Sequence, residues 1–178
     1  MRQPGGFDFS VHARTGKAFV PFVRRGLLQA HHILRPPLRE LSIALVGQTR
    51  MAELHEQYLA IAGPTDVLTF ELDHDARGRV TAGEVVVCVP VALKQARRRG
   101  IEPRREVLLY ALHGMLHLCG FDDRTDRGFQ QMHAQEDAIL TRLGVGPVFR
   151  TSTDNDHRRR PRAPGIRRAH RGRPRGAR

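Results

Sequence analysis

The feature that most constrains the fold is a stretch near the middle of the chain that is apolar on almost every side. Residues 104–118 read RREVLLYALHGMLHL, between Pro103 and Gly120, which suit the start and the end of an α-helix. A helix that is apolar all round must be buried on all sides. We therefore expect a central helix over residues 103–120, with the rest of the domain packed around it.

The segments around this helix alternate between strand and helix patterns. Strands are expected at 7–13, 40–47, 66–72 and 84–89, and further helices at 18–34, 49–61, 90–100 and 126–144. The stretch 84–89, EVVVCV, is typical of a strand buried on both faces, and the polar stretch 73–83 predicts a turn. The order predicts an α+β domain, a mixed sheet of about four strands packed with helices.

The charge of the chain is concentrated at its C-terminal end. Of 178 residues, 150–178 hold eleven of the thirty Lys and Arg but only two of the eighteen Asp and Glu, which is +9 of the formal net charge of +12. We expect one globular domain over residues 1–149 and a disordered, arginine-rich tail over 150–178. Such tails usually bind nucleic acid through its phosphates, although a purely solubilising tail remains an alternative.

Cysteine content and hydropathy indicate where in the cell the protein is expected to be. Cys88 and Cys119 are the only cysteines, and both lie in apolar stretches, as reduced buried thiols do. The N-terminus lacks the apolar core of a secretory signal, and no stretch approaches the roughly 18 apolar residues of a membrane span. We expect a soluble, cytoplasmic protein with no membrane partner.

The central helix ends in a pattern that suits a metal ion. His113 and His117 are four residues apart, so both rings project from one helical face, and they lie in the last turn, where the helix dipole favours a cation. Gly120 allows the chain to turn back, so that Asp122 or Asp123 supplies a third ligand. Three protein ligands leave a fourth position open for a water, whose pKa zinc lowers to about 7. Capping or surface histidines are the alternative.

Four segments together resemble the bacterial YbeY family of metal-dependent endoribonucleases. HGMLHLCGFDD (113–123) is similar to the family motif HGxLHLxGYDH, and GPTDVLTF (63–70) to PTDVLSF. GEVVVC (83–88) resembles GDIVIC, and MHAQEDAIL (132–140) resembles MxxxExxIL. The segments keep the family's order and spacing, and the similarity covers roughly residues 40–143.

The resemblance implies a site and a function. His113 and His117 match the first two metal-binding histidines, and the third falls at Asp123, a carboxylate that also binds metals, so one zinc ion is expected on these three residues. The implied activity is cleavage of single-stranded RNA in ribosomal RNA maturation, at the 3′ end of the small-subunit RNA and in ribosome quality control. Precursor ribosomal RNA and the ribosome are the implied partners.

Two departures from the family keep a second function open. Asp123 replaces a histidine, and Leu59 stands where the family pattern LNxxYR has an arginine thought to help cleave RNA. A non-catalytic ribosome or RNA-binding factor with a structural metal is therefore the alternative. A third candidate, a small metalloprotease, is disfavoured because Gly114 stands where the HExxH motif has its Glu base.

The remaining polar residues receive more ordinary interpretations, and the sequence identifies no general base. Thr65 and Asp66 are expected to form a turn, Asp122 to hold its loop or a ligand histidine, and His133 to be a helix-face histidine. Glu84 is disfavoured as a base. Five arginines near Gly100 are candidates for RNA phosphate contacts or for a solvated surface: Arg97, Arg98, Arg99, Arg104 and Arg105.

Overall fold

The computed structural model describes residues 6–148, so the expected tail over 150–178 lies outside the described residues. The strands are β1 (Asp8–Ala13), β2 (Glu40–Val46), β3 (Val67–His74) and β4 (Val80–Cys88). The helices are α1 (Val20–Leu34), α2 (Gln48–Leu59), α3 (Val89–Arg99), α4 (Pro103–Leu118) and α5 (Asp126–Arg142), and a 3₁₀ turn, η1 (Lys17–Phe19), precedes α1. This order matches the one expected from the sequence.

The four strands form one mixed sheet in the order β1-β2-β4-β3. Strands β1, β2 and β4 run parallel, and β3 is antiparallel to β4. The expected α+β class with a mixed four-stranded sheet is confirmed. Strand β4 begins at Val80 rather than at residue 84, because Val80 and Ala82 pair with β3 beyond an irregularity in its register. The Asp75 carboxylate accepts hydrogen bonds from the backbone N–H groups of Arg77 and Arg79 and so closes the turn between the two strands.

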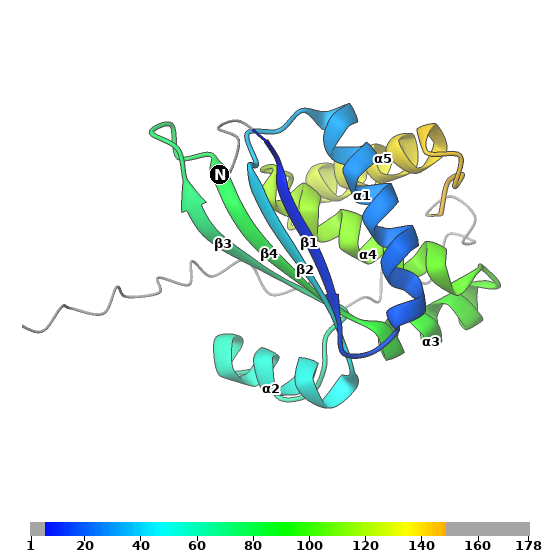
Figure 1. The fold of residues 1–178 in the computed structure, drawn as a ribbon. Coiled ribbons are helices and arrows are strands. Elements are labelled where there is room, and N and C mark those ends of the chain that lie inside the picture. The colour runs from blue at the N-terminus through cyan, green and yellow to red at the C-terminus, as the bar shows by residue number, and fades with distance from the viewer. Residues whose placement is uncertain (1–5, 149–178) are drawn as a thin grey trace, which may run out of the picture.

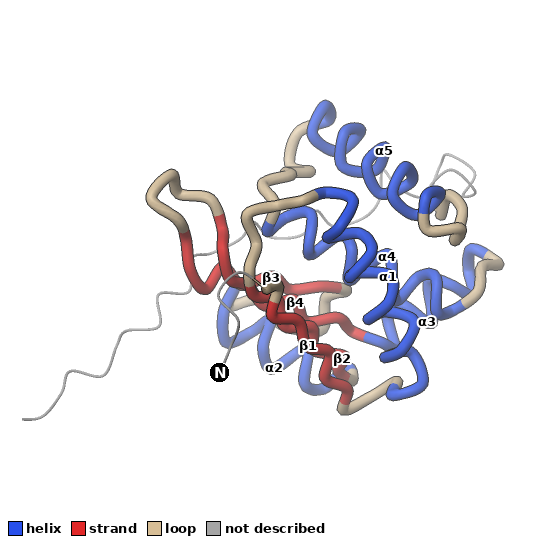
Figure 2. The backbone as a smooth tube through the Cα atoms, turned by 45° about the horizontal axis from the view of Figure 1, so that its top comes forward, coloured by secondary structure: helices blue, strands red, loops and turns tan. Residues whose placement is uncertain are grey.

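The helices cover the two faces of the sheet unequally. Helices α1 and α4 pack against one face, and α2 covers part of the other (Figure 1). A turned view shows α4 between the sheet and α5 (Figure 2). Every residue from Val107 to Leu112 is buried, as expected for a helix that is apolar all round. The central position of α4 is therefore confirmed.

Helix α4 approaches the sheet closely at one glycine. A Cβ atom added to Gly114 would overlap the side chain of Val85 on β4 and come 3.3 Å from Oγ1 of Thr69 on β3. Gly114 thus faces the sheet, whereas His113 and His117 lie on a different side of the helix. This packing sets how far the two histidines stand from the sheet.

The opposite end of α4 is fixed by a buried ion pair. Nη1 of Arg99 lies 2.9 Å from Oε2 of Glu106, and the two side chains are 8% and 0% exposed. Nη2 of the same arginine donates to the backbone carbonyl of Val148 at 2.6 Å, and the Val148 N–H donates to Oδ1 of Asp137 at 3.1 Å. These bonds hold the last described residue of the chain against the domain.

No helix over residues 6–148 combines the length and the apolar composition needed to cross a membrane. Both cysteines are free thiols; Cys88 is buried as expected, whereas Cys119 is only half-buried because it lies at the end of α4.

Candidate metal centre

Two imidazole rings meet at the C-terminal end of α4. Nε2 of His113 lies 3.1 Å from Nε2 of His117, and the rings are nearly perpendicular. Ligand nitrogens around a tetrahedral zinc ion, each about 2.0–2.1 Å from the metal, are about 3.3 Å apart. The observed separation is close to that value, so the helical spacing of four residues delivers the geometry expected from the sequence.

A carboxylate from the following loop faces the same point. Gly120, with φ of 93°, lets the chain leave α4, and the Phe121 N–H donates back to the Leu116 carbonyl at 3.1 Å. The turn brings Asp123 oxygens to 3.7 Å from Nε2 of His113 and 3.7 Å from Nε2 of His117. One ligand atom from each of the three residues lies within 4.8 Å of the others. The three residues expected from the sequence are thus brought together and could hold a metal ion.

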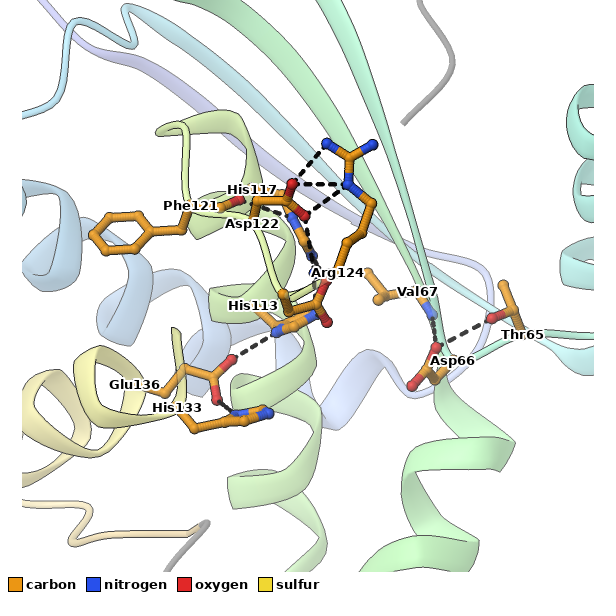
Figure 3. Close-up of polar contacts among 11 residues, drawn as sticks. Thr65, Asp66, Val67, His113, His117, Phe121, Asp122, Arg124, His133 and Glu136 are labelled. Atoms are coloured by element: carbon orange, nitrogen blue, oxygen red, sulfur yellow. Dashed lines mark hydrogen bonds and ion pairs between the residues drawn. The ribbon is translucent and has the colours of Figure 1, made fainter. Parts of the chain in front are cut away.

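The other ring nitrogens show which atoms are free to bind. Nδ1 of His117 donates to the backbone carbonyl of Phe121 at 3.0 Å, because a carbonyl can only accept (Figure 3). Nδ1 of His113 donates to Oε1 of Glu136 at 2.7 Å. With both Nδ1 atoms donating, the two Nε2 atoms face the site, and either a proton or a metal ion between them offsets the repulsion of their lone pairs. This donor set fits a metal ion such as zinc.

Local charges push the pKa values of the two histidines in opposite directions. Burial alone would lower the pKa of His113, but the charge and hydrogen bond of Glu136 outweigh it and raise that pKa. Burial and the neighbouring positive charge of His113 lower the pKa of His117. The pair therefore takes up one proton readily and a second one poorly, and a metal ion bound there would displace that proton.

Residues beside the three candidate ligands hold the surrounding loops. The Asp122 carboxylate accepts hydrogen bonds from the backbone and side chain of Arg124, which lower its pKa, so this residue holds the loop as expected. Asp66 accepts hydrogen bonds from the Thr65 hydroxyl and from the Val67 N–H, which is the turn expected from the sequence. Its carboxylate also contributes to raising the pKa of His113.

Two residues of α5 belong to the site, although the sequence interpretation gave neither of them a role. Glu136, 1% exposed, accepts a hydrogen bond from His113 through one oxygen and from His133 through the other. His133 is itself 7% exposed, so it is a buried residue next to the site. Glu136 is the Glu of the segment MHAQEDAIL, which matches the Glu of the family pattern MxxxExxIL. That match was the one sequence feature that could have indicated a role for this residue.

Comparison with known proteins identifies the family of this chain. The family model described as "Endoribonuclease YbeY" matches residues 16–144. The chain belongs to the YbeY family. The proteins named Endoribonuclease YbeY from Acidothermus cellulolyticus and Thermobifida fusca are 40% and 39% identical to it, over 59% and 58% of this chain and 71% and 72% of theirs. The solution structure of TM1509 from Thermotoga maritima shares the fold, with a TM-score of 0.56, 21% identity and coverage of 83% of this chain and 97% of that one.

The structure places the other residues singled out by the YbeY resemblance. Leu59, in place of the family arginine, ends α2 and packs against an apolar cluster between α2 and the sheet, which includes Met51, Leu54 and Leu68. Val85 faces α4, so its neighbour Glu84 points to the opposite face of the sheet, away from the metal centre. This position agrees with the expectation from the sequence that Glu84 is not the general base.

The five arginines near Gly100 divide into two groups. Arg99 binds Glu106 and the Val148 carbonyl, and Arg105 reaches the Pro147 carbonyl at 3.5 Å, so these two arginines bind within the domain. Arg97, Arg98 and Arg104 are exposed, and Arg104 pairs with Glu102. At 1.5 Å per residue, Arg104 and His117 are about 20 Å apart along α4. The exposed arginines therefore lie at the end of the helix opposite the metal centre.

Proposed function

We propose that this chain is a single-strand-specific, metal-dependent endoribonuclease that binds one zinc ion through His113, His117 and Asp123. Its proposed role is ribosomal RNA maturation in the cytoplasm, in late processing of the small-subunit RNA 3′ end and in ribosome quality control. Precursor ribosomal RNA and the ribosome are the partners. The observation that carries the proposal is the pair of Nε2 atoms 3.1 Å apart beside the Asp123 carboxylate, in a chain of the YbeY family.

The chain's own residues would perform distinct tasks in this reaction. A zinc ion held there would supply Lewis-acid polarisation of a phosphodiester oxygen and lower the pKa of a water molecule. The hydrogen bonds from Nδ1 of His113 and of His117 direct Nε2 towards the site and fix the ring planes. Asp123, with 18% of its side chain exposed, closes the site on the side of the α4–α5 loop. All three ligands are partly exposed, so water and an RNA phosphate could reach the site.

Removal of Asp123 tests the proposal directly. We expect the Asp123→Ala variant to cleave a labelled single-stranded RNA more than about a hundredfold more slowly, beyond the roughly 10–100-fold loss typical of groups that only orient a ligand. Asp123→His, which restores the family residue, should keep most of the activity. Cleavage is followed on denaturing gels, with and without a chelator. Chelator-resistant cleavage, or full activity of Asp123→Ala, would contradict the metal-dependent mechanism.

A second candidate function rests on Leu59. This residue adds to an apolar cluster where the family pattern has an arginine, so the chain lacks that side chain for RNA cleavage. The alternative is a non-catalytic ribosome or RNA-binding assembly factor in which the metal is structural. Absence of any chelator-sensitive cleavage by the wild-type protein, together with tight RNA binding, would favour this function.

The basic tail gives a separate prediction about RNA affinity. Truncation after Phe149 removes a formal charge of +9, and we expect weaker RNA binding with a flatter salt dependence. Each phosphate contact on a single strand contributes about 0.7 to the slope of log affinity against log salt, so the slope should fall by up to about six. The truncation keeps the Val148 hydrogen bonds, so the melting temperature should not change. An unchanged slope would show that the tail contacts no phosphates.

A further inference from the structure

The Glu136 carboxylate lies between two imidazole rings that have different positions relative to the metal centre. Oε1 accepts from Nδ1 of His113 at 2.7 Å, and Oε2 accepts from Nδ1 of His133. His113 contributes Nε2 to the metal centre, whereas His133 is not among the three candidate ligands. Glu136 therefore connects a candidate ligand with a histidine one step further from the metal.

Burial makes this arrangement sensitive to the loss of a partner. Glu136 is 1% exposed, so little water can reach its carboxylate. The N–H groups of His113 and His133 replace the water that would otherwise solvate it.

His133 is held firmly in place to make its hydrogen bond. It lies three residues before Glu136 on α5, so the two side chains share one helical face. Its ring packs edge-to-face with Phe129, with ring centroids 4.2 Å apart. Its plane is 14° from that of His113 at a centroid distance of 6.2 Å. A single hydrogen bond would let the carboxylate turn about its last torsion, and a second bond from a fixed ring stops that rotation.

We propose that His133 is a positioning residue of the metal centre, which acts through Glu136 to fix the ring plane and tautomer of the ligand His113. The proposal rests on the function proposed above, because it takes His113 as a zinc ligand. It adds a residue that the family pattern MxxxExxIL leaves unspecified. The carboxylate oriented by His133 directs the Nδ1 proton of His113, and Nε2 then points at His117 and Asp123.

Zinc affinity of the full chain tests the proposal. His133→Phe keeps an aromatic ring but removes the donor, whereas His133→Asn keeps an N–H donor close to the position of Nδ1. Metal-free protein is titrated with zinc against a chromophoric chelator. We expect His133→Phe to lower zinc affinity about tenfold, the low end of the 10–100-fold range for groups that orient a ligand, and His133→Asn to recover most of that loss. His133→Leu also lacks the donor, so the test can still be made if only one of the Phe and Leu variants folds.

A buried histidine elsewhere provides the matched control. His55 lies on α2, which covers the face of the sheet opposite α4. It is 6% exposed, and its Nδ1 donates to the Gly63 carbonyl at 2.8 Å. His55→Phe should lower the melting temperature and leave zinc affinity unchanged. Wild-type affinity in His133→Phe would overturn the proposal. Equal weakening in His133→Phe and His133→Asn would also overturn it, because ring packing rather than the hydrogen bond would then be the cause.

A measurement on the metal-free protein separates this proposal from the proposed function. The Nδ1 proton of His113, assigned in ¹⁵N-edited spectra by its loss in His113→Gln, should exchange slowly with water in the wild type and faster in His133→Phe. If the wild type bound no zinc while this difference were found, the metal function would fail and the positioning of His113 would stand. If zinc bound and the exchange rates were equal, the positioning proposal would fail alone.

Discussion

Replacement of His117 by alanine should reduce the zinc bound by the purified, reconstituted protein from about one ion per chain to less than about a tenth of an ion at micromolar concentrations. Protein zinc sites bind with an apparent free energy of order 10 kcal/mol shared among the ligands, so the loss of one of three costs about 3 kcal/mol. That is roughly two hundredfold in affinity. Metal content is measured by inductively coupled plasma mass spectrometry after gel filtration.

His117 is a cleaner position for this test than His113. The second nitrogen of His117 bonds to a backbone carbonyl, whereas that of His113 bonds to the buried Glu136 carboxylate. Removal of His113 would leave that charge poorly compensated and destabilise the domain in addition to removing a ligand. His32, an exposed histidine of α1, supplies the control, since His32→Ala should keep its zinc. Zinc retained by His117→Ala, or far less than one ion in the wild type, would contradict the ligand assignment.

The sequence predicts those parts of the site that depend on local geometry. The spacing of His113 and His117 places both rings on one helical face, and a glycine after the last turn predicts a change of direction that returns Asp123. Strand and helix order follow in the same way from apolar periodicity. These features involve residues within about ten positions of one another, where backbone geometry alone sets the distance.

The parts of the site that the sequence did not predict depend on long-range packing. The bond between His113 and Glu136 spans 23 positions, and nothing local to α5 shows which helix its polar face will meet. Histidine is a polar residue that is usually at least partly exposed on a helix surface. His133 is buried because α5 lies over α4. The early start of β4 was missed for a related reason: residues 80–83 are irregular in pattern and become a strand by pairing with β3.

The glycine between the two histidines has a measurable structural role. In an open helix, Gly→Ala stabilises by about 1 kcal/mol, but an added Cβ on Gly114 would overlap Val85. We expect Gly114→Ala to lower the free energy of unfolding by about 1–3 kcal/mol, the usual cost of overpacking a core. For a domain of this size that corresponds to a melting temperature lower by about 3–10 °C, measured by circular dichroism.

A double-mutant cycle with Val85→Ala checks the cause of this loss. Val85→Ala alone should destabilise by leaving a cavity, and in the Gly114→Ala background it should cost much less, because it makes room for the new methyl group. Additive losses would show that Val85 is not the obstacle. The same contact explains the absence of the metalloprotease glutamate: a Glu side chain at position 114 would enter the space between α4 and β4, where it could reach neither the three metal-ligand candidates nor solvent. Packing against the sheet therefore excludes HExxH chemistry in this helix while leaving both histidines free for a metal ion.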